Sequence, residues 1–226
     1  MEMNLPVIKL ETRNLTKKFS ATEGVADISL QVYEHELLTL LGPSGCGKTT
    51  ILRAIGGFNK IDSGKILLDG AEVQGLPPEK RPTGMVFQSY NLWPHMTIYE
   101  NMAFGLKLRK TPKKEMDAQI AEMLALVKMS GSEKKYPTQL SGGQQQRVAI
   151  GRALMNAPQV MLADEPTGSL DSRNGHEIIK LLKESNKKYG QTLLLVTHDE
   201  NIALQANRII SISDGRVVRD ERQVAR

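Results

Sequence analysis

The hydrophobic positions of this chain of 226 residues fall into short, nearly continuous runs that alternate with segments of helical periodicity. Such apolar runs are typical of strands covered on both faces, as in parallel sheets. The runs are Glu36–Leu41, Gly84–Gln88, Gln159–Ala163, Thr192–Thr197 and Arg208–Ser213. Helices are predicted over Lys48–Gly56 and Asn174–Tyr189. This alternation of strand and helix predicts an α/β fold with helices on both faces of a parallel sheet.

Two segments depart from the alternation. Near the N-terminus, Val7–Thr12, Ser29–Tyr33 and Lys65–Asp69 alternate like strands of an antiparallel sheet, which predicts a β layer beside the core. Between Gln88 and Arg152 the periodicity is mostly helical. Apolar residues at helical spacing there are interpreted as core: Met116, Ile120, Met123, Leu124 and Val127.

We therefore predict a single domain with an inserted helical subdomain. Residues 1–88 and 150–226 are expected to form the core with its β layer, and residues 89–149 the helical subdomain.

Composition and charge narrow the class mainly by exclusion. No apolar run approaches the roughly 20 residues of a membrane span, and the N-terminus lacks the basic and apolar regions of a signal peptide. The single cysteine, Cys46, excludes an internal disulfide, so we expect a cytosolic protein. The net charge is +5, but the basic residues are scattered and aromatic residues make up only 4%. A base-stacking platform is therefore not expected, nor is a nucleic-acid partner.

The clearest chemical motif is a glycine-rich turn between a predicted strand and a predicted helix. It reads Gly42-Pro43-Ser44-Gly45-Cys46-Gly47-Lys48-Thr49, is followed by Thr50, and fits the pattern G-x-x-x-x-G-K-[ST]. The glycines let backbone N–H groups turn toward phosphate oxygens, and the helix N-terminus adds partial positive charge. Lys48 is expected to reach the outer phosphates and Thr49 to ligate Mg²⁺. Cys46 is interpreted as a small residue that fits the turn rather than as a redox sensor.

Two carboxylates follow the apolar strand that ends near Ala163. Asp164 is placed to hold Mg²⁺ through water, and Glu165 is then free to orient or deprotonate an attacking water. The sequence therefore predicts a nucleoside triphosphate site with a metal-side carboxylate and a general base.

A second glycine turn, Leu140-Ser141-Gly142-Gly143-Gln144-Gln145-Gln146-Arg147, opens a predicted helix over Gln145–Ala157 and supplies another anion site. Two such helix starts far apart in one chain do not easily reach one nucleotide, whereas two chains arranged head to tail can.

These motifs resemble those of the ATP-binding cassette (ABC) ATPases. LSGGQQQR is similar to their signature motif and LGPSGCGKTT to their Walker A motif. The resemblance implies ATP and Mg²⁺ as ligands. It also implies that Ser141, Gly142, Gly143 and Gln144 contact the nucleotide held by a second cassette.

Further motifs of the family follow in the expected order. Gln88 matches the Q-loop glutamine, which links Mg²⁺ and water to the helical subdomain. Asp171 matches the D-loop, which crosses to the partner subunit, and His198 matches the switch histidine that contacts the γ-phosphate. Phe19 lies where the family has an aromatic residue stacked on adenine, with packing in the core as the alternative.

The resemblance implies a subunit that closes and opens with ATP hydrolysis and drives a separate membrane permease. The permease is expected to dock near Tyr90–Glu100, which would hold the protein at the inner face of the plasma membrane. The alternative, a soluble ABC ATPase acting on DNA or ribosomes, is disfavoured because coiled-coil insertions, zinc cysteines and a second cassette are absent from the sequence.

The direction of transport stays open, because the chain resembles two subfamilies. Arg81–Arg109 looks like importers of the maltose and polyamine type. Asp164–Ser172 and Ile209–Arg219 look more like the lipoprotein-release and macrolide-export group. The chain is also expected to lack the C-terminal regulatory domain of maltose-type cassettes. The transported substrate and the choice between homodimer and heterodimer stay open as well.

Overall fold

The structure is a computed structural model that describes residues 6–20 and 22–223. The chain divides into two compact units, which we call the sheet unit and the helical unit. The sheet unit comprises Met1–Met85, Gln159–Glu165 and Ser185–Arg226. The helical unit comprises Val86–Pro158 and Pro166–Glu184. Each unit is described by itself.

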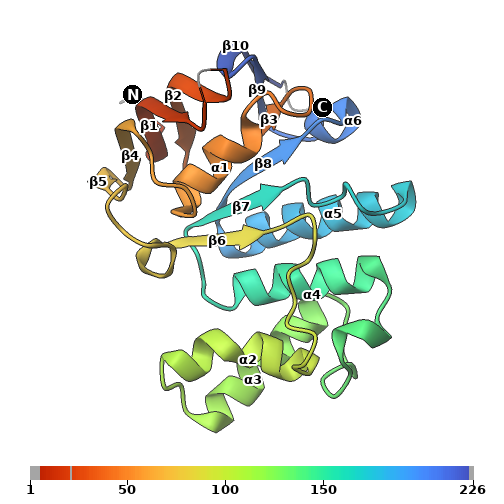
Figure 1. Cartoon of the computed structure of the whole chain (residues 1–226). Helices are drawn as coiled ribbons and strands as arrows, with labels where there is room; N and C mark the ends of the chain where they lie inside the picture. The colour runs from red at the N-terminus through yellow and green to blue at the C-terminus, as the bar shows by residue number, and fades with distance from the viewer. Residues whose placement is uncertain (1–5, 21, 224–226) are drawn as a thin grey trace, which may run out of the picture. The chain divides into compact units, whose positions relative to one another are not determined.

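A six-stranded sheet forms the centre of the sheet unit, in the order β10-β9-β3-β8-β7-β6 (Figure 1). Its strands are β3 (Leu37–Leu41), β6 (Thr83–Val86), β7 (Val160–Asp164), β8 (Thr192–Thr197), β9 (Arg208–Ser213) and β10 (Arg216–Arg222). The four central strands β9, β3, β8 and β7 run parallel, and β10 pairs antiparallel with β9. Every residue of β7 and β8 is buried, which explains the apolar runs Val160–Ala163 and Leu193–Val196 within them.

The predicted β layer is a four-stranded antiparallel sheet in the order β2-β1-β4-β5. Its strands are β1 (Ile8–Lys18), β2 (Gly24–Tyr33), β4 (Ser63–Leu68) and β5 (Ala71–Glu72). The first two are longer than predicted, because irregularities in their pairing between Thr12 and Leu15, and between Leu15 and Lys17, interrupt the alternation of apolar residues.

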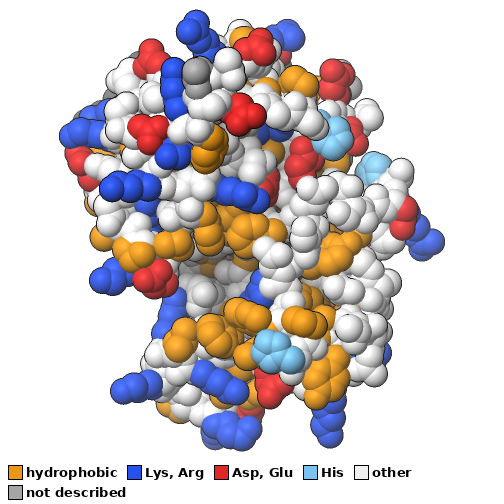
Figure 2. All heavy atoms as spheres, viewed as in Figure 1, with side chains coloured by type: hydrophobic (Ala, Val, Ile, Leu, Met, Phe, Trp, Pro, Cys, Tyr) orange, Lys and Arg blue, Asp and Glu red, His pale blue; other side chains and the backbone are white. Residues whose placement is uncertain are grey.

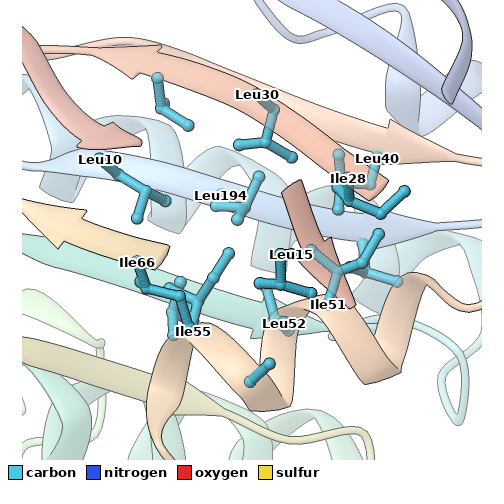
Figure 3. Close-up of a cluster of buried hydrophobic side chains, with 14 of the residues drawn as sticks. Leu10, Leu15, Ile28, Leu30, Leu40, Ile51, Leu52, Ile55, Ile66 and Leu194 are labelled. Carbon is cyan, nitrogen blue, oxygen red and sulfur yellow. The ribbon is translucent and has the colours of Figure 1, made fainter. Parts of the chain in front are cut away.

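The core of the sheet unit surrounds helix α1 (Lys48–Gly56), whose bounds match the prediction. Figure 3 shows Ile51, Leu52 and Ile55 of α1 among leucines and isoleucines from both sheets, such as Leu10 and Leu194. Because apolar side chains enclose α1, its position is fixed by packing, and so is the loop that leads into it.

The helical unit contains α2 (Ile98–Leu108), α3 (Lys113–Leu126) and α4 (Gly142–Leu154), which contact one another (Figure 1). It also contains the larger part of α5 (Ser172–Tyr189). The residues interpreted as core from their helical spacing are buried: Met116, Ile120, Met123, Leu124 and Val127. Short helices complete the chain: α6 (Glu200–Ala203) and the 3₁₀ turns η1 (Pro78–Lys80) and η2 (Pro137–Gln139). No helix among the described residues is both long and apolar enough to cross a membrane.

Several other predicted strand ends are wrong by one or two residues, and three wrong boundaries lie beside candidate site residues. The strand predicted to end at Gln88 ends at Val86, so Gln88 lies in the following loop. The helix predicted over Gln145–Ala157 covers Gly142–Leu154, because a capping box formed by Ser141 and Gln144 lets it begin at the two glycines. α5 begins at Ser172, two residues before the predicted Asn174.

Candidate functional site

The glycine-rich turn joins the end of β3 to the first turn of α1. Gly47 is the N-cap of α1 and has φ 103°, in the left-handed region. A Cβ atom at Gly47 would lie 2.3 Å from Val25 Cγ1, so both the backbone angle and the available space require glycine there. The turn can therefore present backbone N–H groups and the α1 N-terminus to an anion.

Lys48 lies inside this turn. Its Nζ donates hydrogen bonds to the carbonyl oxygens of Gly42 and Pro43, both at 2.7 Å. Cys46 is buried, with its Sγ 3.7 Å from the same Nζ. The ammonium group is thus held against the loop, within reach of any phosphate that the loop encloses.

Thr49 and Asp164 meet although they are far apart in the chain. Thr49 Oγ1 donates to Asp164 Oδ1 at 2.7 Å, and Arg53 Nε lies 3.9 Å from Asp164 Oδ2. Asp164 is the last residue of β7, which is separated from β3 by β8. A hydroxyl and a carboxylate are the hard oxygen donors that Mg²⁺ prefers, so this pair fits the expected metal.

Glu165 leaves the end of β7 in a left-handed conformation, with φ 45°. Its N–H donates to Val196 O on the neighbouring strand β8 at 3.0 Å. Its Oε1 lies 2.9 Å from Nδ1 of His198, which follows β8. The Glu165 side chain is largely buried, whereas the His198 side chain is exposed, so His198 covers Glu165 at the protein surface.

Phe19 belongs to the sheet unit but not to its core. It is 58% exposed, and Lys17 Nζ lies 5.5 Å from its ring centroid. Core packing, the alternative interpretation from sequence, is therefore wrong for this ring, which is available to stack on a planar group.

The second glycine turn begins α4 in the helical unit. Ser141 N donates to Gln144 Oε1 at 3.0 Å, and Gln144 N donates to Ser141 Oγ at 3.4 Å. Both Ser141 and Gln144 are exposed, whereas Gly143 is buried. This second helix N-terminus is capped by its own serine and lies at the surface, where a second chain can reach it.

Asp171 precedes α5 in the same unit. Its carboxylate accepts hydrogen bonds from Asn174 N at 2.9 Å and Asn174 Nδ2 at 2.6 Å. These bonds, above all that from the Asn174 backbone, hold the pKa of Asp171 below its ordinary value. Asp171 is therefore a charged cap of α5 at neutral pH.

The structure brings together one set of predicted residues in each unit. Lys48, Thr49, Asp164, Glu165 and His198 lie in the sheet unit. Gln88, Asp171 and the residues Ser141–Gln144 lie in the helical unit. The sequence interpretation missed Gln146, a fully buried glutamine on α4. The available signal was a polar residue on a helix face otherwise occupied by the buried Ala149, Ile150 and Ala153.

The segment expected to receive a permease is held in shape from within the helical unit. Asn101 is fully buried and bonds to the backbone of Trp93 through both its Oδ1 and its Nδ2. The Trp93 ring lies 4.5 Å from that of Phe104, between ring centroids, and the Arg152 guanidinium lies 4.8 Å from the Trp93 centroid. Burial lowers the pKa of Arg152 to about 10, so it remains a cation at neutral pH.

Arg152 also donates to the carbonyl oxygen of Asn91 at 2.7 Å. Tyr90 and Asn91 are consecutive residues with left-handed backbones, with φ 59° and 51°. The loop after Gln88 is thus a defined turn with partly exposed aromatic residues.

Comparison with known proteins agrees with this geometry. The sequence model of the ABC transporter family matches residues 25–168. A spermidine/putrescine import ATP-binding protein PotA from Clostridioides difficile is 47% identical over 209 residues, covering 92% of this chain and 60% of the relative. The protein of the same name from Thermotoga maritima is 43% identical over 211 residues, covering 93% and 57%. The chain thus spans less than two thirds of the length of these relatives.

Among solved structures, an ATP-binding cassette in a dimeric, post-hydrolysis state bound to ADP and Pi is 36% identical. It superimposes with a TM-score of 0.85, covering 96% of this chain and 99% of that one.

Proposed function

Because this chain belongs to the ABC transporter family, we propose that it is the ATP-hydrolysing subunit of a membrane transporter. The observation that carries the proposal is the meeting of Thr49 and Asp164 at 2.7 Å, with the Glu165–His198 pair on the adjoining strand ends. This arrangement combines a phosphate cradle, metal-side oxygen donors and a base, which are the parts that triphosphate hydrolysis needs.

In this proposal the turn from Gly42 to Thr50 encloses the phosphates. Lys48 exchanges its bonds to the loop carbonyl oxygens for bonds to the outer phosphate oxygens. Phe19 stacks on the adenine through its exposed ring.

Thr49, Asp164 and Gln88 are proposed to hold Mg²⁺, Asp164 through water. When bound, Mg²⁺ neutralises charge that develops on the phosphate oxygens. The Thr49–Asp164 pair is already aligned by a hydrogen bond, so both oxygens face the same space.

Glu165 is proposed to orient or deprotonate the attacking water. Its left-handed backbone turns it away from the direction of β7, and His198 fixes one of its carboxylate oxygens. His198 is proposed to contact the γ-phosphate as well, so that the base and the terminal phosphate would share one partner.

Two cassettes are proposed to close head to tail on two ATP molecules and to reopen after hydrolysis. Each would present Ser141, Gly142, Gly143 and Gln144, and also Asp171, to the nucleotide of the other. The exposed, serine-capped start of α4 supports this arrangement, as does the related cassette that was solved as a dimer with ADP and Pi.

The permease is proposed to dock on Tyr90–Glu100, at the inner face of the plasma membrane. The Trp93–Phe104 pair and the partly buried Arg152 over the Trp93 ring support a shaped, partly apolar surface there. The polyamine import proteins at 43–47% identity favour an import role over export. A nucleic-acid partner is not proposed, because basic and acidic side chains are interspersed on the face drawn in Figure 2.

The test is ATP hydrolysis by the purified chain, with and without Mg²⁺, compared with Lys48→Ala. The variant is expected to lose hydrolysis and most nucleotide binding, because the charge that meets the outer phosphates is removed. Exposed Lys180→Ala, in the helical unit, is the control and should hydrolyse ATP as wild type does. Hydrolysis at the normal rate by Lys48→Ala would contradict the proposed cradle.

A further inference from the structure

Gln146 joins three segments of the helical unit through one side chain. It is fully buried on α4, and its Nε2 donates to Phe87 O at 3.2 Å and to Pro166 O at 2.7 Å. The two N–H groups of the amide thus donate to two backbone carbonyl oxygens. The two acceptors are 59 and 20 residues away in the chain, so these bonds connect segments that sequence does not connect.

The two acceptors lie next to residues of the proposed machinery. Phe87 immediately precedes Gln88, and Pro166 immediately follows Glu165 and begins the segment that leads to Asp171. Gln146 itself lies in the first turns of the helix that Ser141 caps. One carboxamide therefore ties the start of α4 to the backbone beside Gln88 and to the backbone beside Glu165.

The start of α4 leaves no room for a side chain at either glycine. A Cβ at Gly142 would lie 2.6 Å from the Tyr90 hydroxyl and 3.5 Å from Leu170 Cδ2. A Cβ at Gly143 would lie 2.7 Å from Asn174 Oδ1. Tyr90 of the loop after Gln88 and Leu170 of the segment after Pro166 thus both lie close to Gly142, so the two segments tied by Gln146 also pack against the start of α4.

The amide of Gln146 is only partly satisfied by hydrogen bonds. Its Oε1 is buried and has no hydrogen-bond partner within residues 6–20 and 22–223. An unpaired buried acceptor is unfavourable, and an apolar side chain of the same length would avoid it. What the amide provides that an apolar side chain cannot is the pair of hydrogen bonds to Phe87 O and Pro166 O.

We propose that Gln146 is a positioning residue that keeps the Gln88 loop, the Pro166–Asp171 segment and the start of α4 in one fixed arrangement. The proposal deepens the proposed ATPase function and rests on it, because these segments carry Gln88, Ser141 and Asp171. A permease movement transmitted to the loop after Gln88 would then reach both the signature turn and the segment after Glu165 through this amide.

The test compares Gln146→Met, which keeps the length and removes both donors, with Gln146→Glu, which adds a buried carboxylate facing two carbonyl oxygens. Gln119→Glu, at a partly exposed position on α3 where Gln119 donates to Glu115, is the control for the change of charge. Measurements are kcat and KM for ATP, the affinity for trinitrophenyl-ATP, and thermal unfolding of the full chain.

Gln146→Met is expected to lower kcat by about ten-fold or more, the scale of one net hydrogen bond lost in the transition state. Trinitrophenyl-ATP affinity should stay within about two-fold of wild type, because the phosphate cradle lies in the sheet unit. Amide hydrogen exchange should rise in residues 87–91 and 166–171 and stay unchanged in residues 42–50. Gln119→Glu should behave as wild type.

Wild-type kcat and unchanged exchange in Gln146→Met would overturn the proposal. So would a joint fall of kcat, probe affinity and melting temperature, which would make Gln146 a purely structural residue. If Gln146→Glu does not fold, Gln146→Met decides, and failure of both to fold would also show a structural role. If the wild-type chain has no ATPase activity, the proposed function is refuted. Amide hydrogen exchange in Gln146→Met would still show whether Gln146 holds the three segments together.

Discussion

Replacing Glu165 by glutamine isolates one chemical property of the proposed site. Gln keeps the length and shape of the side chain, and its amide oxygen can still accept a hydrogen bond from His198 Nδ1, which lies 2.9 Å from the present Oε1. The backbone bond to Val196 and the left-handed turn are unaffected. The substitution therefore removes proton acceptance and little else.

The expected loss follows from the part a general base plays. General bases contribute roughly 10²- to 10⁴-fold, or about 2.7–5.4 kcal/mol of activation free energy. ATP binding should survive, because Lys48, Thr49 and Asp164 keep their contacts. Since closure needs ATP and reopening needs its hydrolysis, Glu165→Gln should accumulate as an ATP-bound dimer.

Single-turnover hydrolysis and gel filtration with and without ATP measure the two consequences. Low ionic strength is preferable, because salt screens a charged interface. The exposed Glu200→Gln, in the sheet unit, is the matched control and should remain active. A fully active Glu165→Gln would refute its role as the base, and an inactive but strictly monomeric variant would refute the head-to-tail arrangement.

Three other substitutions test separate parts of the structure. Ser141→Arg should leave ATP binding by the monomer nearly intact and abolish turnover, because the long cationic side chain would prevent the second cassette from closing on the nucleotide. Equal loss of binding and turnover would argue against a site that needs residues from both cassettes. Gly47→Ala should lower the melting temperature by about 4–8 °C, since a strained backbone costs roughly 2 kcal/mol. Gly45 also has a left-handed φ, of 81°, but a Cβ there would meet nothing within 4 Å, whereas one at Gly47 would lie 2.3 Å from Val25, so Gly45→Ala should lower the melting temperature less. Asp220 accepts hydrogen bonds from Arg208, which lower the pKa of Asp220 in the folded protein. The stability that this pair adds is therefore fully present above the unfolded pKa of about 3.9, and it is lost as the pH falls through the lower folded pKa. Urea unfolding at pH 7 and pH 3 should therefore show a smaller acid loss of stability for Asp220→Asn than for wild type.

Much of the fold is determined locally, which is why sequence alone predicted it. Thr192–Thr197 and Arg208–Ser213 agree with the observed strands to the residue. β8 is buried along its whole length and is apolar from Leu193 to Val196, and β9 has isoleucine at each of its three buried positions. The bounds of α1 were also correct, since the glycine turn marks its start and Gly57 its end. The identities of the phosphate, carboxylate and signature residues follow from short motifs that need only neighbouring residues.

The ends of strands that depend on contacts with distant parts of the chain could not be predicted from the sequence. The sequence gives no sign that β6 stops at Val86 and leaves Phe87 O to accept from Gln146, because that bond depends on a helix 59 residues further on. The long β1 was missed for a similar reason: its bulges are stabilised by pairing with β2 on one side and β4 on the other.

Only the tertiary structure decided which of the motif residues meet. The strand order places β8 between β3 and β7, so Thr49 reaches Asp164 across an intervening strand, and Glu165 finds His198 at the end of its neighbour. Parallel strands bring their carboxyl ends to one edge, but which strands are adjacent is set by how the helices pack on the sheet. The left-handed turn of Glu165 and the two bonds of Gln146 likewise come from packing, because each needs partners that the chain supplies only once it is folded.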